Sequence, residues 1–218
     1  DVLGSRGLGD VYKRQVKNGG KAIAVACNVL NDADLVNLVD KAVAEYETVN
    51  ILVNNAGGGG GGRENPFQID IAYFKRVFNL NLFSAWRLCQ LVVPHMAESG
   101  YGSIINITSM GSINKSPNMS AYASSKAALN HMAGNLAFDF GPMGIRINNV
   151  GPGATRTHAL STVLTPEIEA KMLEHTPIKR LGEVSDITGA VLYFAAPVSQ
   201  WVSGQTLFVN GGGIQTLD

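Results

Sequence analysis

The chain lacks the features that mark secreted, membrane and nucleic-acid-binding proteins. Only two of its 218 residues are cysteines, Cys27 and Cys89, which is too few for a disulfide framework and typical of free thiols in a reducing compartment. Lys+Arg and Asp+Glu number 17 each, so there is no basic surplus to attract nucleic acid or anionic lipid. No apolar run approaches the roughly 20 residues of a membrane helix, and no apolar signal-peptide region follows the start. We therefore expect a cytoplasmic protein with no nucleic-acid and no membrane partner.

Metal ligands are also scarce. The chain has four histidines, and they show no metal-ligand spacing among themselves or with the cysteines: His95, His131, His158 and His175. Structural and catalytic zinc sites draw on such spaced ligand sets. The sequence therefore predicts no metal site.

Glycine and an alternation of strand-like and helix-like segments are what the chain does have. Of its 25 glycines, six are consecutive, at 57–62; such a cluster marks a tight turn or a close approach of backbone to ligand. Short apolar runs predict five buried strands, at 22–27, 51–53, 103–109, 145–150 and 206–209. Helical periodicity predicts helices at 31–46, 71–98, 120–140, 166–175 and 184–194. We expect Pro94 to kink or end the second helix.

This alternation predicts an α/β fold whose parallel sheet is covered by helices on both faces. In such sheets ligands bind in the crevice at the carboxyl ends of the strands. The residues that directly follow the predicted strands are therefore the candidates for a binding site. They are Asn28, Val29, Asn55 with the glycine run, Ser109, and Gly151-Pro152-Gly153.

Tyr122 and Lys126 form the most informative pair. Residues at i and i+4 share one face of a helix. A phenol has a pKa near 10 and is a poor base at neutral pH. A nearby ammonium stabilises the phenolate, so we expect Lys126 to lower the pKa of Tyr122 towards 7. Taken alone, the pair is more typical of an ordinary exposed helix face than of a catalytic site.

Ser109 supplies the context for that pair. It ends a predicted strand, thirteen residues before Tyr122, so its hydroxyl would point into the crevice. There it could hold a substrate oxygen while Tyr122 exchanges a proton with that oxygen. No Gly-x-Ser-x-Gly elbow surrounds Ser109, which argues against a serine hydrolase.

Together these segments resemble the short-chain dehydrogenase/reductase family over residues 19–218. The resemblance rests on Asn54-Asn55-Ala56-Gly57, Asn81, Ser109, Tyr122 with Lys126, and Gly151-Pro152-Gly153. It implies a Rossmann-like doubly wound parallel sheet and an NAD(P)-dependent alcohol dehydrogenase. Tyr122 would be the catalytic acid/base, Lys126 would hold the nicotinamide ribose, and Ser109 would position the reacting oxygen. Asn81 would complete a proton relay through water; the alternative is a polar residue on a solvated helix face.

The resemblance also implies the cofactor contacts. They would be Asn28, Val29, Asn55, Ala56, Gly57, Tyr122, Lys126, Pro152, Gly153, Thr155, Arg156 and Thr157. Asn28 stands where the family usually has an aspartate that holds the adenine, and an amide can still donate and accept hydrogen bonds. Asn114 matches a polar substrate contact, although a loop asparagine is equally typical of a turn.

A narrower likeness is to the bacterial hydroxysteroid dehydrogenases. It implies oxidation of the 7α-hydroxyl of bile acids with NAD, and a homotetramer. NADP is not excluded, because the residue that selects between them falls in a segment that we do not find. The apolar residues Leu160, Val163, Leu164, Ile168 and Met172 would either line a steroid cleft or serve as helix core. A 3-oxoacyl-carrier-protein reductase, a sugar dehydrogenase, an inactive fragment and a non-enzymatic binding protein remain alternatives.

The start of the chain departs from the family. A strand–turn–helix–strand unit should precede residue 22, but only 18 residues separate Gly9 from Asn28, and one such unit needs about 30 residues. We therefore expect residues 1–15 to be a non-native leader and 16–218 to be a single, partial domain that lacks its first unit and binds no NAD by itself. The segment after the glycines, Arg63-Glu64-Asn65, makes that loop longer than in the hydroxysteroid enzymes.

Overall fold

The computed structural model describes residues 15–59, 64–161 and 164–213. Four parallel strands form its sheet in the order β1-β2-β3-β4. They are β1 (Ile51–Asn54), β2 (Gly102–Ile107), β3 (Ile145–Pro152) and β4 (Thr206–Val209). The four predicted strands after residue 50 are thus confirmed, with two changes in their bounds: β2 ends at Ile107, two residues before its predicted end, and β3 continues two residues further than expected. Each connection between them is a crossover that carries at least one helix, which is how parallel strands must be joined.

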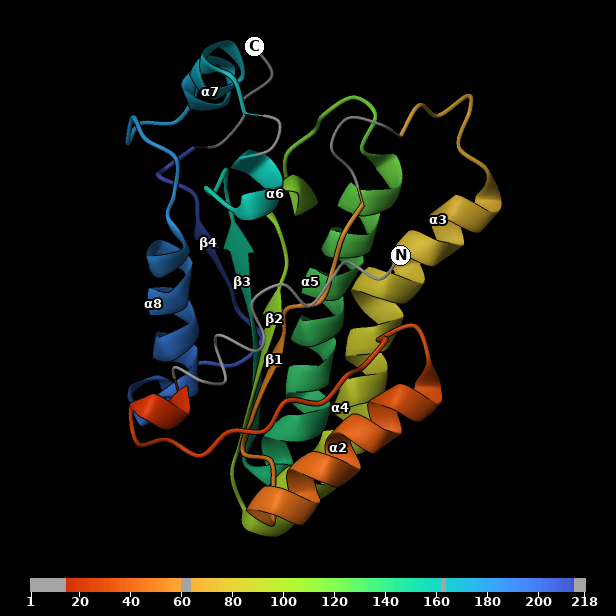
Figure 1. Ribbon diagram of the computed structural model, residues 1–218, viewed down its shortest axis with the longest axis vertical. Helices are drawn as coiled ribbons and strands as arrows, with labels where there is room; N and C mark the ends of the chain where they lie inside the picture. The colour runs from red at the N-terminus through yellow and green to blue at the C-terminus, as the bar shows by residue number, and fades with distance from the viewer. Residues whose placement is uncertain (1–14, 60–63, 162–163, 214–218) are drawn as a thin grey trace.

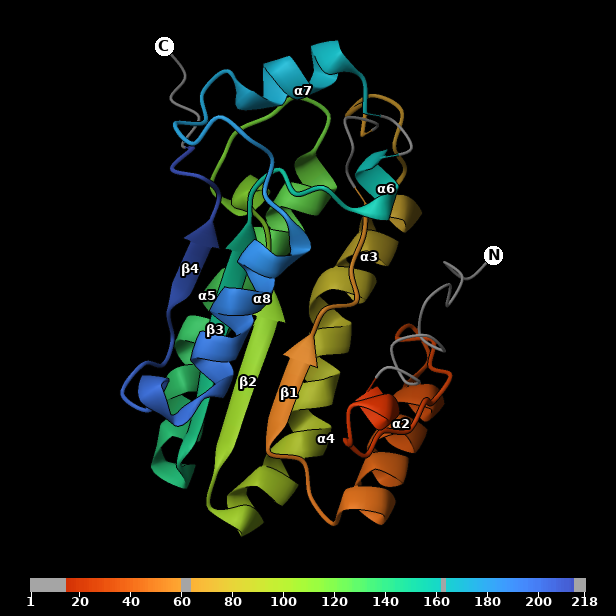
Figure 2. The ribbon, with the colours of Figure 1, turned by 60° about the vertical axis from the view of Figure 1, so that its left-hand side comes forward.

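Helices cover both faces of the sheet (Figures 1 and 2). On one face α2 (Asp32–Tyr46), α4 (Ser84–Ser99) and α5 (Ser120–Phe140) enclose the larger core, which includes Ile104 and Ile147 at 0% exposure. On the other face α8 (Val184–Ala195) packs Phe194 against Ile105 and Val150. The side chains of a strand alternate between faces, so β2 contributes to both cores. The predicted doubly wound α/β fold is confirmed.

The remaining elements are short. They are α6 (His158–Ser161), α7 (Pro166–Leu173) and the 3₁₀ turns Met110–Ser112, Gly141–Met143 and Pro197–Ser199. The helix starts follow ordinary capping chemistry. Asn31 accepts a hydrogen bond from the Ala33 amide at the start of α2, and Thr165 accepts one from Ile168 at the start of α7. Within the described residues no helix is long and apolar enough to cross a membrane.

The long predicted helix is interrupted, but not where proline predicted it. It begins as α3 (Ile71–Phe78), widens into a π-helical turn at Asn79–Phe83 and continues as α4. Pro94 lies inside α4 and does not end it; the helix ends at Gly100, which has φ of 69°. The π turn places Asn81 in the interior with 2% exposure. Single π turns of this kind are frequent at functional sites.

Residues 22–27 were predicted as a buried strand, and this is wrong. The segment has no regular secondary structure, and Ile23 is 39% exposed. A strand is stabilised by hydrogen bonds to a neighbouring strand, and no described strand lies beside this segment. An apolar run without a partner edge is not sufficient. The predicted leader, residues 1–15, lies outside the described residues except for Gln15.

A row of hydrogen-bonded asparagine side chains aligns the carboxyl ends of the strands. Asn54, Asn106 and Asn149 are register partners on β1, β2 and β3. Asn54 Nδ2 donates to Asn106 Oδ1 at 2.8 Å, and Asn106 Nδ2 donates to Asn149 Oδ1 at 3.0 Å. Asn149 Nδ2 then donates to the Thr206 hydroxyl on β4, also at 3.0 Å. Because slipping one strand would unpair these buried amides, this row specifies the register. It brings the residues that follow the strands to one edge.

Candidate active site

Tyr122 and Ser109 meet at the carboxyl edge of the sheet. Ser109 lies two residues after the end of β2, and its hydroxyl accepts a hydrogen bond from the Gly111 amide at 3.0 Å. Tyr122 lies in the first turn of α5, and the Ser109 side chain is near enough to its phenol to lower its pKa. A Cβ placed on Gly111 would lie 3.3 Å from Ser109 Oγ and 3.6 Å from the Tyr122 ring. The structure therefore brings together two groups that the sequence analysis paired.

Lys126 follows one helical turn later and is only 4% exposed. Its Nζ lies 6.0 Å from the centre of the Tyr122 ring and donates to the Ile107 carbonyl oxygen at 2.8 Å. Burial disfavours the ammonium and lowers the pKa of Lys126 to about 8. The alternative of an exposed ion-bearing helix face does not apply to this residue.

The pKa of Tyr122 is raised, not lowered as the sequence predicted. Burial of the phenol is the main cause; the nearby Ser109 side chain opposes it, and the negative charge of Glu64 adds to it. Lys126 does not reverse this, because its Nζ points to the Ile107 carbonyl and its own charge is disfavoured. The phenol is therefore held in its protonated form at neutral pH.

Asn81 is fully engaged with the backbone of the glycine loop. Its Oδ1 accepts from the Gly58 amide at 2.9 Å, and its Nδ2 donates to the Gly58 carbonyl oxygen at 2.8 Å and to Ser125 Oγ at 2.9 Å. A Cβ on Gly57 would come within 2.9 Å of Asn81 Oδ1 and 3.0 Å of Lys126 Nζ. The solvated-face alternative for Asn81 is excluded, and its side chain fixes the loop beside Lys126.

A hollow of about 610 Å³ opens beside this loop. Five of the predicted cofactor contacts line it: Asn28, Val29, Asn55, Ala56 and Gly57. Its wall combines exposed backbone with apolar side chains of α3 and the π turn, among them Val77 and Leu80. A mostly apolar, concave surface with a few polar groups is typical of cofactor sites. The residues present therefore fit a nucleotide cofactor that runs towards Lys126.

A second, smaller hollow lies near the end of β3, and only some of the remaining predicted contacts line it. Gly153 and Asn114 line that hollow of about 170 Å³ together with Met110. Thr155 and Thr157 instead hydrogen-bond locally, to Gly153 O at 3.0 Å and to the Leu160 amide at 3.3 Å. Arg156 forms ion pairs with Glu169 at 3.2 Å and Glu183 at 3.4 Å. Pro152 ends β3. The structure groups Asn114 with Gly153 but does not bring Thr155, Arg156 and Thr157 into either hollow.

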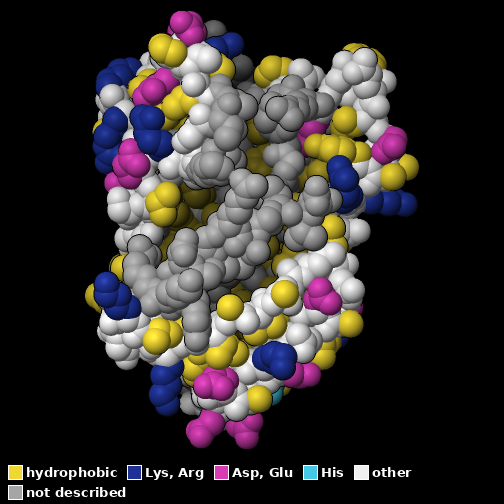
Figure 3. All heavy atoms as spheres, in the orientation of Figure 1, with side chains coloured by type: hydrophobic (Ala, Val, Ile, Leu, Met, Phe, Trp, Pro, Cys, Tyr) yellow, Lys and Arg dark blue, Asp and Glu magenta, His cyan; other side chains and the backbone are white. Residues whose placement is uncertain are grey.

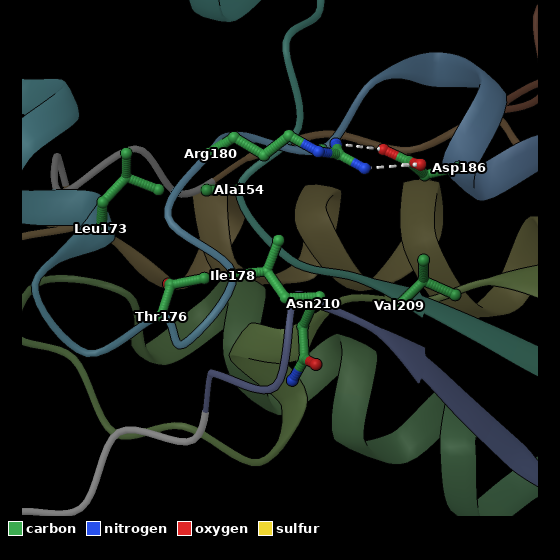
Figure 4. Close-up of a pocket in the computed structure, with 10 residues that line it drawn as sticks. Ala154, Leu173, Thr176, Ile178, Arg180, Asp186, Val209 and Asn210 are labelled. Carbon is green, nitrogen blue, oxygen red and sulfur yellow. Dashed lines mark hydrogen bonds and ion pairs between the residues drawn. The ribbon is translucent and has the colours of Figure 1, made fainter.

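A further pocket lies beside the segment after Gly153 (Figure 4) and was not predicted. It holds about 140 Å³ between Ala154, Ile178 and Asn210. At its rim Arg180 Nη1 donates to Asp186 Oδ2 at 2.6 Å, in a paired contact that Figure 4 draws. Arg180 lowers the pKa of Asp186 to about 2. Since Asp186 also caps α8 through the Glu183 amide, this pair anchors α8.

Glu64 is the site residue that sequence reasoning missed. It is 0% exposed and accepts hydrogen bonds from the amides of Ala121 and Tyr122. The sequence analysis noted it only as part of a longer loop. No periodicity or spacing signals a loop carboxylate that folds against a helix 57 residues away. Among the described residues no three His, Cys, Asp or Glu side chains are grouped as a metal site.

Comparisons with known proteins agree with this geometry. Residues 5–213 match the family model described as Enoyl-(Acyl carrier protein) reductase. The 7alpha-hydroxysteroid dehydrogenase of Escherichia coli (strain K12) is 50% identical over 200 residues, which cover 92% of this chain and 77% of that protein. The enzyme of the same name from Bacteroides fragilis is 30% identical, with 95% and 81% covered.

Solved structures show the same likeness. A 7α-hydroxysteroid dehydrogenase complexed with NADH and 7-oxoglycochenodeoxycholic acid superposes with a TM-score of 0.90 at 48% identity, covering 96% of this chain and 81% of that one. A putative gluconate dehydrogenase from Agrobacterium tumefaciens gives 0.89 at 28% identity, covering 96% and 83%. The chain therefore belongs to the short-chain dehydrogenase/reductase family, with close homology to the 7α-hydroxysteroid dehydrogenases.

Proposed function

We propose that this chain oxidises the 7α-hydroxyl of bile acids, with Tyr122 as the acid/base and NAD as the hydride acceptor. The observation that carries the proposal is that the Ser109 hydroxyl and the Tyr122 ring lie side by side next to the buried Lys126: the Cβ position of Gly111 is 3.3 Å from the first and 3.6 Å from the second. A phenol and a hydroxyl that converge on one point can hold and deprotonate a single alcohol oxygen.

The chain's own residues supply the proton chemistry. Ser109 orients the substrate oxygen, and the phenolate of Tyr122 takes the hydroxyl proton as the carbon–oxygen double bond forms. NAD, when bound, supplies the acceptor for the hydride that leaves the same carbon. Since burial keeps Tyr122 protonated at neutral pH, oxidation should accelerate as the pH rises, and reduction of the ketone should be favoured at lower pH.

The two hollows support a division of binding. Asn28, Val29 and the 55–57 segment would take the adenine side of the cofactor in the larger hollow. Pro152, Gly153, Thr155, Arg156 and Thr157 would lie along its pyrophosphate and nicotinamide. For Thr155, Arg156 and Thr157 this requires the local bonds and ion pairs described above to rearrange. Asn81 would act by holding the glycine loop and by joining a water-mediated relay from Lys126.

The steroid assignment rests on the names of the relatives and on the surface around Asn114. Asn114 and Met172 line the same small hollow, and Met172 and Ile168 of α7 are each 38% exposed. Exposed apolar side chains on this helix fit an apolar cleft wall better than a helix core. Leu160 and Leu164 are half-buried, and Val163 lies outside the described residues.

Product identification tests this proposal. The protein is incubated with NAD and cholate, and the product is analysed by mass spectrometry and NMR. A 7-oxo product supports the proposal. A 3-oxo or 12-oxo product, or activity only in the reductive direction on an acetoacetyl thioester or only on a sugar, would replace the steroid assignment with one of the alternatives within the family.

We also propose a cytoplasmic homotetramer. The free thiols of Cys27 and Cys89 fit a reducing compartment. Large apolar side chains stand exposed on α5 and after α8, with Phe138 at 85% and Trp201 at 98%, as expected of a surface covered by another copy. Sedimentation velocity on the protein and on a Phe138→Ser variant tests this; a monomeric wild-type protein would contradict it.

A further inference from the structure

The helix that carries Tyr122 begins without a cap of its own. Met119 is the residue before the first turn of α5, and its side chain makes no capping hydrogen bond. The first intrahelical bond runs from the Ala123 amide to the Met119 carbonyl oxygen at 2.8 Å. The amides of Ala121 and Tyr122 therefore have no acceptor within the helix. A buried helix start of this kind needs partners from elsewhere in the chain.

Glu64 supplies those partners from the end of the glycine loop. Its Oε2 accepts from the Ala121 amide at 2.7 Å and from the Tyr122 amide at 3.1 Å, and its Oε1 lies 3.2 Å from the Tyr122 amide. A carboxylate at a helix N-terminus is stabilised both by these N–H groups and by the helix dipole. Such charge-assisted bonds are the strong ones, so this contact fixes the first turn of α5.

Two further hydrogen bonds and the burial of its side chain fix the position of Glu64. Its amide donates to the Asn118 carbonyl oxygen at 3.0 Å, which ties it to the segment that leads into α5. The Tyr73 hydroxyl on α3 donates to Oε1 at 3.4 Å. The side chain is 0% exposed, beside a cavity of about 280 Å³ that Asn114 and Lys115 also line. Because this carboxylate is fixed in place, it also fixes the Ala121 and Tyr122 amides that are bonded to it.

We propose that Glu64 is a positioning residue for the acid/base: it caps α5 in place of Met119 and fixes the Tyr122 phenol against Ser109. The inference deepens the proposed function and rests on it for its catalytic meaning. Glu64 and Asn114 line the same cavity, so the residue that holds the first turn of α5 stands beside the proposed substrate contact. The negative charge of Glu64 also contributes to the raised pKa of Tyr122.

Other titratable groups around this point differ from Glu64 in kind. They are Tyr73 on α3, Lys115 after β2, and Lys126 on α5. Tyr73 is itself a neutral donor to the carboxylate, and the two lysines carry the opposite charge. Glu64 is the acidic group that acts on the Tyr122 pKa, so removing its charge should lower that pKa.

Two variants separate the cap from the charge. Glu64→Gln keeps an acceptor oxygen and removes the charge, whereas Glu64→Ala removes both. Asp70→Asn is the matched control, because Asp70 caps α3 through the Tyr73 amide at 2.6 Å and asparagine caps equally well. Two readouts require no turnover: amide exchange of Ala121 by ¹⁵N-alanine NMR, and absorbance titration of Tyr122 taken as the difference from Tyr122→Phe.

We expect Glu64→Ala to exchange the Ala121 amide on the order of tenfold faster, with Glu64→Gln in between. Glu64→Gln should lower the Tyr122 pKa on the order of half a unit, and Asp70→Asn should change neither. Unchanged exchange in Glu64→Ala, or a Tyr122 titration that does not move in Glu64→Gln, overturns the proposal. If Glu64→Ala does not fold, Glu64→Gln and Glu64→Asp carry the test. A wild-type protein that oxidises no alcohol would refute the proposed function while both readouts still judge Glu64.

Discussion

The centre of the sheet and its β1 edge differ in how completely they are enclosed. β2 and β3 are paired on both sides, and nearly all their residues are buried. β1 is paired only with β2 among the described strands, and its Ile51 and Val53 are 45% and 40% exposed. Figure 2 shows β1 at the margin of the sheet, on the side of α2. Hydrophobic side chains are scattered over the face that Figure 1 presents (Figure 3).

This difference separates the residues proposed for proton transfer from those proposed to hold the adenine side of the cofactor. Ser109, Tyr122 and Lys126 stand on the enclosed part, built on β2 and α5. Asn28 and Val29 belong to an irregular segment next to the exposed edge. An apolar strand edge without a partner is a liability for solubility and for binding. Among the described residues, the proposed proton-transfer groups are thus assembled on a sheet whose β1 edge has no strand partner.

Tyr122→Phe is the sharpest test of the enclosed part. The change removes only the phenol oxygen, so turnover should fall by about 100-fold or more while cofactor affinity is unchanged. Steady-state kinetics and calorimetric titration with NADH measure the two quantities. Tyr46→Phe is the control, because Tyr46 lies at the end of α2, outside the candidate site, and is 37% exposed. A Tyr122→Phe variant that retains a tenth of the wild-type turnover would sink the acid/base assignment.

Adding a partner for β1 is the test of the open edge. We propose that a strand–turn–helix–strand unit placed ahead of residue 16, taken from the Escherichia coli relative, pairs with β1 and supplies a helix N-terminus for the pyrophosphate. Affinity for NAD should rise at least tenfold over that of the 218-residue chain, and the exposure of the β1 edge should fall. Calorimetry and hydrogen exchange of residues 51–54 measure this. Equal, micromolar NAD affinity in both proteins would show that the added unit contributes nothing to cofactor binding, and it would contradict this proposal.

The sequence predicted the paired, buried strands better than the segment beside the β1 edge. The apolar runs predicted at 103–109 and 145–150 have neighbours on both sides and form β2 and β3, because burial and pairing act together. The run 22–27 is also apolar but has no partner among the described strands, and propensity cannot reveal that. The Ser109–Tyr122–Lys126 group was predictable because strand ends and helix spacing place it. Glu64 was not, since a loop carboxylate that caps a distant helix leaves no local pattern.

Gly57→Ala probes where the two parts of the site meet. The new methyl group would lie 2.9 Å from Asn81 Oδ1 and 3.0 Å from Lys126 Nζ, and both atoms are held by hydrogen bonds. We expect a loss of about 3 kcal/mol in the free energy of unfolding. Gly189→Ala in α8 is the control, since nothing lies within 4 Å of its Cβ position, and it should stabilise by about 0.5–1 kcal/mol. Urea denaturation compares them; similar effects would show that the loop is not tightly held.

Lys126→Met should change the free energy of unfolding less than Gly57→Ala does, and at pH 7 it should raise this free energy where Gly57→Ala lowers it. The folded protein lowers the pKa of Lys126 from 10.5 to about 8, so the folded state binds fewer protons than the unfolded state between those pH values. Burying the ammonium therefore costs about 3 kcal/mol below pH 8, and this cost disappears as the pH rises to 10.5.

Methionine avoids that cost but loses the hydrogen bond to the Ile107 carbonyl oxygen, which contributes about 1 kcal/mol. The variant should thus be more stable than wild type by about 2 kcal/mol at pH 7. Near pH 10.5 the wild type no longer bears the cost, so the variant, which lacks the hydrogen bond, should be the less stable of the two by up to about 1 kcal/mol, while catalysis is lost. Urea unfolding at pH 7, 9 and 10.5 measures the trend. A gain that is independent of pH would show that packing, and not the buried charge, distinguishes this enclosed part of the site from the open edge.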